Sequence, residues 1–169
     1  LLHAPTLFQL AALKGKKPRL RGAKIIIEND EKQSPVLGDA NMVRRMAKWG
    51  NPLNPVDVLK FATKRKLAKV VFDTAHFWRM WPNKLQRQGL WQEFMRSANQ
   101  NLPIYWHMNH NNGDFFEINT RQGGEHDEWL VEVCKFAGKR VKGGIDQVCL
   151  EEPRRVAVSH GVTMTYISP

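Results

Sequence analysis

The chain has 169 residues, of which 42% are hydrophobic, and this size and composition predict one domain over residues 1–169 with a single core. No run of about 18 apolar residues is present, which argues against a membrane-spanning helix. The formal net charge of +10 favours a polyanionic partner, with nucleic acid ahead of a membrane because no amphipathic anchor helix accompanies the charge. Solvated helix faces are the alternative explanation of the same charge.

The ends and the thiols of the chain lead to two further expectations. Because the first residue is Leu1 rather than Met and lies inside an apolar segment, we expect further residues before it. Cys134 and Cys149 form neither a CxxC motif nor a disulfide framework. They therefore predict buried thiols and a reducing compartment, taken as the cytoplasm.

Strands and helices are predicted to alternate along the chain. Strands are expected at 1–3, 24–30, 70–72, 103–106 and 147–150, from short apolar or β-branched runs. Helices are expected at 6–13, 39–49, 54–67, 85–98 and 127–137, from apolar spacing and from caps such as Asn54-Pro55. Sequential crossover units of this kind predict an α/β fold with a parallel sheet.

A polar cluster follows each predicted strand and none precedes a strand. In a parallel (β/α) barrel of the TIM type, the site lies at the carboxyl ends of several strands. A doubly wound sheet also binds ligands there, but it usually carries a Gly-rich phosphate turn after its first strand, and this chain has none. The pattern therefore favours the barrel.

The side chains at the strand ends are of types that bind metals. The candidates are His3, Glu28, Asp73, His76, His107 and Glu151, with His110, Asp114, His126 and Glu152 nearby. Imidazoles and carboxylates without thiolates suit zinc, manganese or iron in a catalytic site. Six ligands exceed the needs of one zinc ion and predict two or three metals that activate a water. A hydrogen-bonded structural histidine, or a glutamate that caps a helix or pairs with arginine, is the alternative at each position taken singly.

Four motifs resemble those of the xylose-isomerase-like metal barrels, and most of all the endonuclease-IV-type apurinic/apyrimidinic endonucleases. They are Ile27-Glu28-Asn29, Phe72-Asp73-Thr74-Ala75-His76, His107-Met108-Asn109 and Leu150-Glu151-Glu152-Pro153. The resemblance covers roughly residues 1–153 and implies a (β/α)8 barrel of which this chain supplies the last four to five units. It also implies that another segment or chain supplies the first strands.

The resemblance implies a metal-dependent phosphodiesterase, in which a metal-activated hydroxide attacks the DNA phosphate 5′ to an abasic site. Two or three Zn²⁺ ions, or Mn²⁺, would be held by His3, Glu28, Asp73, His76, His107 and Glu151, with Glu28, Asp73 and Glu151 central to catalysis. Glu28 would bridge the metals. The family's Asp-x-His pair is replaced here by Glu117-Ile118-Asn119, so His110 or His126 is a candidate substitute.

A basic and aromatic connection after the third predicted strand is expected to lie in a loop at the same mouth. Trp78, Arg79, Trp81 and Lys84, with Arg121, are candidates for contact with a DNA duplex that carries a damaged site. Packing of the tryptophans against the outer helices is the alternative.

Two other functions fit the same residues. A sugar isomerase or epimerase on this barrel shares the ligands but has no need of the positive charge. A non-catalytic, barrel-derived nucleic-acid-binding component would retain the charge and lack activity.

Overall fold

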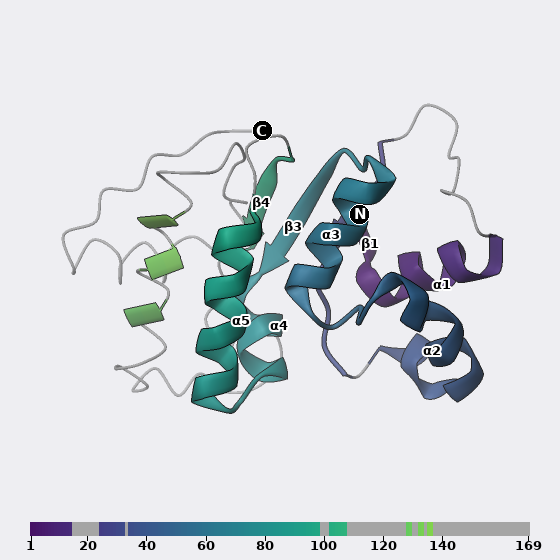
Figure 1. Cartoon of the computed structure of the whole chain (residues 1–169), viewed down its shortest axis with the longest axis horizontal. Coiled ribbons are helices and arrows are strands. Elements are labelled where there is room, and N and C mark those ends of the chain that lie inside the picture. Colours follow the sequence, from purple (N-terminus) through teal and green to yellow (C-terminus); the bar gives the residue numbers. More distant parts are fainter. Residues whose placement is uncertain are drawn as a thin grey trace.

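The computed structural model describes residues 1–14, 24–32, 34–98 and 102–107, together with 128, 129, 132, 133, 135 and 136. Within these residues the fold is α/β, with parallel strands and α-helices in alternation (Figure 1). The strands are β1 (Leu2–His3), β2 (Ile26–Glu28), β3 (Lys69–Asp73) and β4 (Ile104–His107). The α-helices are α1 (Ala4–Lys14), α2 (Ala40–Met46), α3 (Pro55–Arg65), α4 (Thr74–Met80) and α5 (Lys84–Ser97). Two 3-10 helices, η1 (Pro35–Gly38) and η2 (Ala47–Trp49), flank α2.

The four strands form one parallel sheet in the order β1-β2-β3-β4, so strands that follow one another in the chain are neighbours in space. The register pairs His3 with Glu28 and Asp73 with His107, which brings the carboxyl ends of the strands to one edge. The predicted parallel sheet is therefore confirmed. Its closure into a barrel stays a prediction, because the described strands form a sheet open at β1 and at β4.

The core lies between this sheet and its helices. In β3, residues Val70 to Asp73 are all buried, as expected for a strand covered on both faces. The Phe72 ring lies 4.7 Å from Phe94 of α5 and 5.3 Å from Trp106 of β4, measured between ring centroids. Helices α3 and α5 pack side by side over the sheet (Figure 1).

Capping residues set where two of the helices begin. The Asn54 side chain accepts from the Val56 N–H, and Pro55 opens α3, as the sequence predicts. Asp73 is the N-cap of α4, because its Oδ1 accepts from the His76 N–H at 2.9 Å. The same aspartate therefore ends a strand and begins a helix.

Helix α4 corrects the prediction that Trp78 and Arg79 lie in a loop. Both residues are helical, and the helix buries Ala75, Phe77 and Met80 against the core. The Asp73 cap and this apolar face stabilise a helix of only two turns. The connection to α5 is therefore confined to residues 81–83.

Some predicted features lie outside the described residues. These are the strand at 147–150, the candidate ligands His110, Asp114, His126, Glu151 and Glu152, and Arg121, Cys134 and Cys149. In the described part of the predicted helix at 127–137, Trp129, Val133 and Phe136 are buried in the core, as expected from their spacing. No helix among the described residues is long and apolar enough to cross a membrane.

Candidate metal centre

Carboxylates and imidazoles from all four strand ends meet at the carboxyl edge of the sheet. His107 Nδ1 lies 2.7 Å from Glu28 Oε1 and 3.8 Å from Asp73 Oδ2. On the other side, His3 Nε2 lies 3.8 Å from Glu28 Oε2. Glu28 is therefore the central carboxylate, approached by a histidine from each side, which is the place that the resemblance gives to a bridging ligand.

Asp30 joins this group, although it is absent from the ligands predicted from the sequence. Its Oδ1 lies 3.3 Å from His3 Nδ1, and the residue is 9% exposed. Side chains two positions apart in an extended chain point to the same side, so Glu28 and Asp30 both face His3. The alternation Glu-Asn-Asp was the signal from which Asp30 could have been found.

Buried hydrogen bonds between the ends of β2 and β3 fix the orientation of the ligands. Asn29 donates from Nδ2 to the Asp73 carbonyl at 3.0 Å and accepts at Oδ1 from the Asp73 N–H at 2.7 Å. His76 Nδ1 lies 3.0 Å from the Asn29 carbonyl oxygen, so Nδ1 carries the proton that this bond needs. His76 Nε2 is then the nitrogen with a lone pair for a metal, which is the usual carbonyl–histidine–metal arrangement.

The ionisation states of the site reflect its burial and its close pairs. Burial lowers the pKa of His107, but hydrogen bonds to Asp73 and Glu28 outweigh this effect and raise the pKa to about 10. Burial raises the pKa of Asp73, yet the hydrogen bond from His107 and the charge of His76 bring it below its ordinary value. Without a metal, His107 is therefore an imidazolium between two carboxylates.

His3 and Asp30 form a second histidine–carboxylate pair nearer the surface, and each shifts the pKa of the other. The hydrogen bond to Asp30 raises the pKa of His3, against the opposing effect of partial burial. Burial alone would raise the pKa of Asp30, but the bonds from His3 and from the Glu31 N–H lower it. The His107 proton thus offsets part of the negative charge that is gathered at this edge, and a divalent ion could take its place.

The residues present fit a divalent metal. In each of two sets, His3–Asp30–His76 and Glu28–Asp73–His76, the ligand atoms all lie within 4.8 Å of one another. Atoms bound to one zinc ion at about 2.0–2.2 Å are somewhat closer than this, so small side-chain rotations would complete either set. Both sets need His76, and its single available nitrogen assigns it to one ion at a time. His107 would have to release its proton before it could bind a metal.

A hollow of approximately 370 Å³ opens above the outer of these two sets. It is lined by His3, Thr6, Asp30, Glu31, Ser34, Pro35 and His76. His3 is half-exposed here, while Glu28 is 3% exposed beneath it. Exposure therefore increases from the buried Glu28 carboxylate to the accessible His3 imidazole. A substrate would approach from the His3 side.

Those residues predicted to contact DNA that the structure describes have partners within the protein. Arg79 donates from Nε to Glu31 Oε2 at 2.8 Å. The Arg87 guanidinium stacks on the Trp78 ring at 3.6 Å, and Trp78 lies 5.4 Å from Trp129 between ring centroids. Trp81 is partly buried against the core. These contacts agree with the packing alternative, and contact with DNA stays a prediction.

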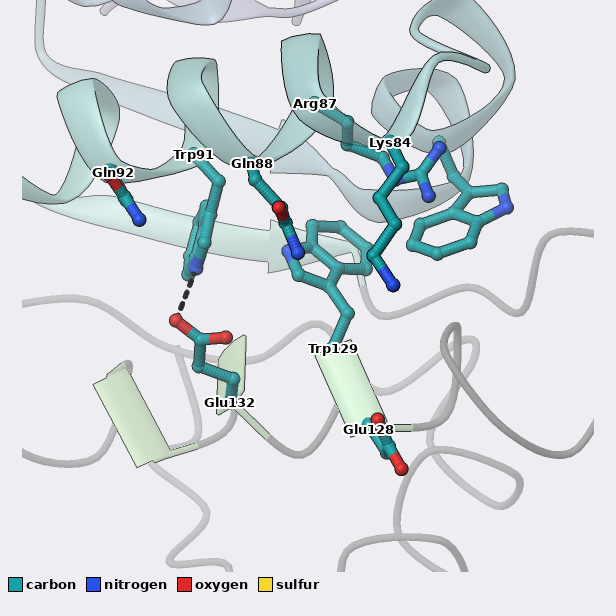
Figure 2. A pocket seen from close by; sticks show the side chains of 9 residues that line it. Lys84, Arg87, Gln88, Trp91, Gln92, Glu128, Trp129 and Glu132 are labelled. Atoms are coloured by element: carbon teal, nitrogen blue, oxygen red, sulfur yellow. Dashed lines mark hydrogen bonds between the residues drawn. The ribbon is translucent and has the colours of Figure 1, made fainter.

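Lys84 and Trp78 line a second hollow of approximately 290 Å³ between α5 and residues Glu128, Trp129 and Glu132. Figure 2 shows Gln88, Trp91 and Gln92 on the face of α5 that looks toward Trp129 and Glu132. Trp91 Nε1 donates to Glu132 Oε1 at 2.8 Å across this space (Figure 2). The contact holds α5 against the following helical segment.

Comparison of the chain with protein-family models, with curated proteins and with solved structures gives no match. The resemblance to the xylose-isomerase-like barrels therefore stays a prediction from the motifs. The chemistry of the sheet edge is the basis on which a function is inferred.

Proposed function

We propose that this chain is part of a metal-dependent phosphodiesterase that acts on DNA in the manner of an apurinic/apyrimidinic endonuclease. One observation carries the proposal, namely the convergence of six metal-competent side chains at the carboxyl edge of a parallel sheet. They are His3, Glu28, Asp30, Asp73, His76 and His107. In this proposal the open edges of the sheet at β1 and β4 pair with further strands, including the predicted strand at 147–150.

The chain's own residues would prepare the centre for catalysis. A divalent ion held there would supply positive charge next to the phosphate and a nucleophilic water at neutral pH. Asn29 holds Asp73 and His76 in place through its backbone and side-chain bonds. Glu28 is paired with the His107 proton, so loading with metal would release that proton and leave both groups as ligands. The half-exposed His3 marks the side on which a phosphate would enter.

The choice of DNA over a sugar rests on charge and on the motifs. The net charge of +10 suits a polyanion and is of no use to an enzyme acting on a small neutral sugar. The abasic site as the specific substrate rests on the resemblance of the Asp-Thr-x-His and Leu-Glu-x-Pro motifs. An isomerase with the same ligands is the competing enzyme.

The first experiment measures metal content by elemental analysis after exhaustive dialysis. We expect two or three equivalents of zinc or manganese, reduced in Glu28→Ala and in Asp73→Ala. Glu93→Ala is the matched control, because Glu93 is a carboxylate on α5 that pairs with Lys60 at 3.3 Å, away from the sheet edge. Circular dichroism of each variant checks that the fold is intact.

The second step compares cleavage of a duplex that contains an abasic site with turnover of aldose sugars. Incision 5′ to the abasic site that disappears in Glu28→Ala and persists in Glu93→Ala supports the proposal. Retained metal with sugar turnover instead favours the isomerase. Absence of retained metal rejects the catalytic proposal and favours a binding role.

A further inference from the structure

Three cationic side chains gather around the ring of Trp49. The Arg65 guanidinium carbon lies 3.8 Å from the ring centroid, and the Nζ atoms of Lys48 and Lys64 lie at 5.2 and 5.7 Å. All three are within the distance at which a cation is attracted by an indole face. The ring therefore organises positive charge from two separate elements, η2 and the last turn of α3.

The indole is fixed in place beneath these cations. Trp49 packs edge-on against Phe61 of α3, with ring centroids 5.8 Å apart and planes at 90°. Phe61 in turn stacks on Phe8 of α1 at 4.2 Å, which anchors the pair in the core. Lys48 and Lys64 are exposed, so their ammonium groups face solvent on a rigid support.

Basic residues outnumber acidic residues in the segment that carries this cluster. Residues 40–66 contain seven basic residues, namely Arg44, Arg45, Lys48, Lys60, Lys64, Arg65 and Lys66, and one acidic residue, Asp57. Asp57 accepts from the Asn51 N–H, and Lys60 pairs with Glu93 of α5. Within the described part of the chain, Arg65 Nε and Nη2 are buried without a hydrogen-bond partner. The fold therefore keeps like charges together where their repulsion opposes stability.

We propose that this surface, the Trp49 patch, binds the phosphate backbone of a double-stranded nucleic acid. We define the patch as Lys48, Lys64 and Arg65 around Trp49. Arg44, Arg45 and Lys66 lie within four residues of these cations in the chain. Cations from η2 and from the last turn of α3 match neighbouring phosphates of a backbone, and binding would relieve their mutual repulsion. Contacts to phosphates alone carry no sequence information, so the binding is independent of sequence.

The chemistry of the patch favours a nucleic acid over a membrane surface. Membrane-bound helices present an exposed apolar face for insertion between lipids. Here the Trp49 ring is packed on Phe61 and covered by the Arg65 guanidinium, so it is not available for insertion. Positive charge without an exposed apolar face is typical of proteins that bind the duplex backbone.

The Trp49 patch is separate from the candidate metal centre. Arg65 and Lys66 lie at the end of α3, just before Lys69 begins β3, whereas Asp73 lies at the opposite end of that strand. The five residues of β3 place these ends about 13 Å apart. The inference therefore does not depend on the metal or on the proposed catalysis.

The test measures affinity for an undamaged 20-base-pair duplex by fluorescence anisotropy over a series of salt concentrations, with EDTA present throughout. Chelation removes any contribution of a metal at the sheet edge, so the result is distinguishable from failure of the proposed function. The variants are Lys48→Gln, Lys64→Gln and the double change. Lys135→Gln is the matched control, because Lys135 is also an exposed helical lysine but lies beyond α5.

Each patch variant is expected to lower the slope of log affinity against log salt by about 0.9, and the double variant by about 1.8. Lys135→Gln is expected to leave the slope unchanged. Equal slopes for the patch variants and the control overturn the proposal. So does a loss of binding to phosphatidylserine vesicles in the patch variants with no change for the duplex, which would assign the patch to a lipid surface.

Discussion

His107 and Glu28 approach to 2.7 Å although their strands, β4 and β2, are separated by β3. Neighbouring strands lie about 4.8 Å apart, so two side chains span about 10 Å of sheet to meet. They do so above the end of β3, where Asp73 lies 3.8 Å from the same imidazole nitrogen. Without a metal, this imidazolium is the positive charge that stabilises the two buried carboxylates.

The first prediction is that protonated His107 stabilises the metal-free protein and that this stabilisation is lost at alkaline pH. Its pKa rises from an ordinary 6.5 to about 10 on folding, so the folded state binds the proton more tightly. The stabilisation is therefore complete below about pH 6.5 and is lost as the pH rises through about 10. In urea unfolding with EDTA at pH 6, the free energy of unfolding of His107→Gln should be about 3 kcal/mol lower than that of the unchanged protein. Most of that difference should vanish at pH 10, and a difference that is constant with pH would contradict the assignment.

The second prediction concerns Asn29, whose side chain makes both a donor and an acceptor bond to the backbone of Asp73. Asn29→Ala removes both of these buried hydrogen bonds and should destabilise the fold by about 2–4 kcal/mol. Asn41→Ala is the control, since Asn41 is exposed near the start of α2, and its effect should stay within about 0.5 kcal/mol. Chemical denaturation measures both, and similar losses for the two variants would reject the role given to Asn29.

The third prediction is that Asp30 supports metal binding, both as a member of the His3–Asp30–His76 set and as the partner of His3. Asp30→Asn removes the charge that holds the imidazole at 3.3 Å, so zinc affinity should fall about 10- to 100-fold. Glu31→Gln makes the same chemical change one residue away, where the carboxylate pairs with Arg79, and should leave zinc affinity unchanged. Competition with a chromogenic chelator measures both constants. Equal affinities in the two variants would remove Asp30 from the site.

The fourth prediction is that alanine substitution has opposite effects on stability at Gly50 and at Gly89. Gly50 has φ +101°, and an added Cβ would lie 2.8 Å from Asp57 Cγ, so Gly50→Ala should destabilise the fold by about 1–3 kcal/mol. An added Cβ at Gly89, inside α5, meets nothing within 4 Å. Gly89→Ala should therefore stabilise the fold by about 0.5–1 kcal/mol through helix propensity. Thermal melts of the two variants should move in opposite directions, and two shifts of the same sign would disagree with this geometry.

Local chemistry in the sequence predicts much of the sheet edge. The run Val70–Phe72 predicts a strand buried on both faces, and Asn54-Pro55 predicts the start of a helix; the structure has both. The convergence of His3, Glu28, Asp73, His76 and His107 follows from parallel strands whose ends carry metal-competent residues. These features depend on neighbours in sequence and on the period of each element, which a single chain displays directly.

Other features depend on contacts that the local pattern does not display. The sequence predicts a loop at Trp78 and Arg79, whereas the structure has helix α4 there, whose stability comes from the Asp73 cap and from buried Phe77. Asp30 lies two positions after Glu28, but its pairing with His3 at the end of another strand is a contact that the local pattern does not display. Closure of the sheet depends on what pairs with the edges of β1 and β4, which no short motif specifies.

The strand order β1-β2-β3-β4 also affects how such a centre could change over evolutionary time. Because each strand contributes its own donor at its end, the donors are arranged in space in the order in which they occur in the chain. A substitution or insertion after β1 alters one corner of the centre, whereas a change at Asn29 after β2 also disturbs Asp73 and His76, which follow β3. Under the proposed function, the β1 corner could therefore diverge independently, while the β2 and β3 corners would have to change together.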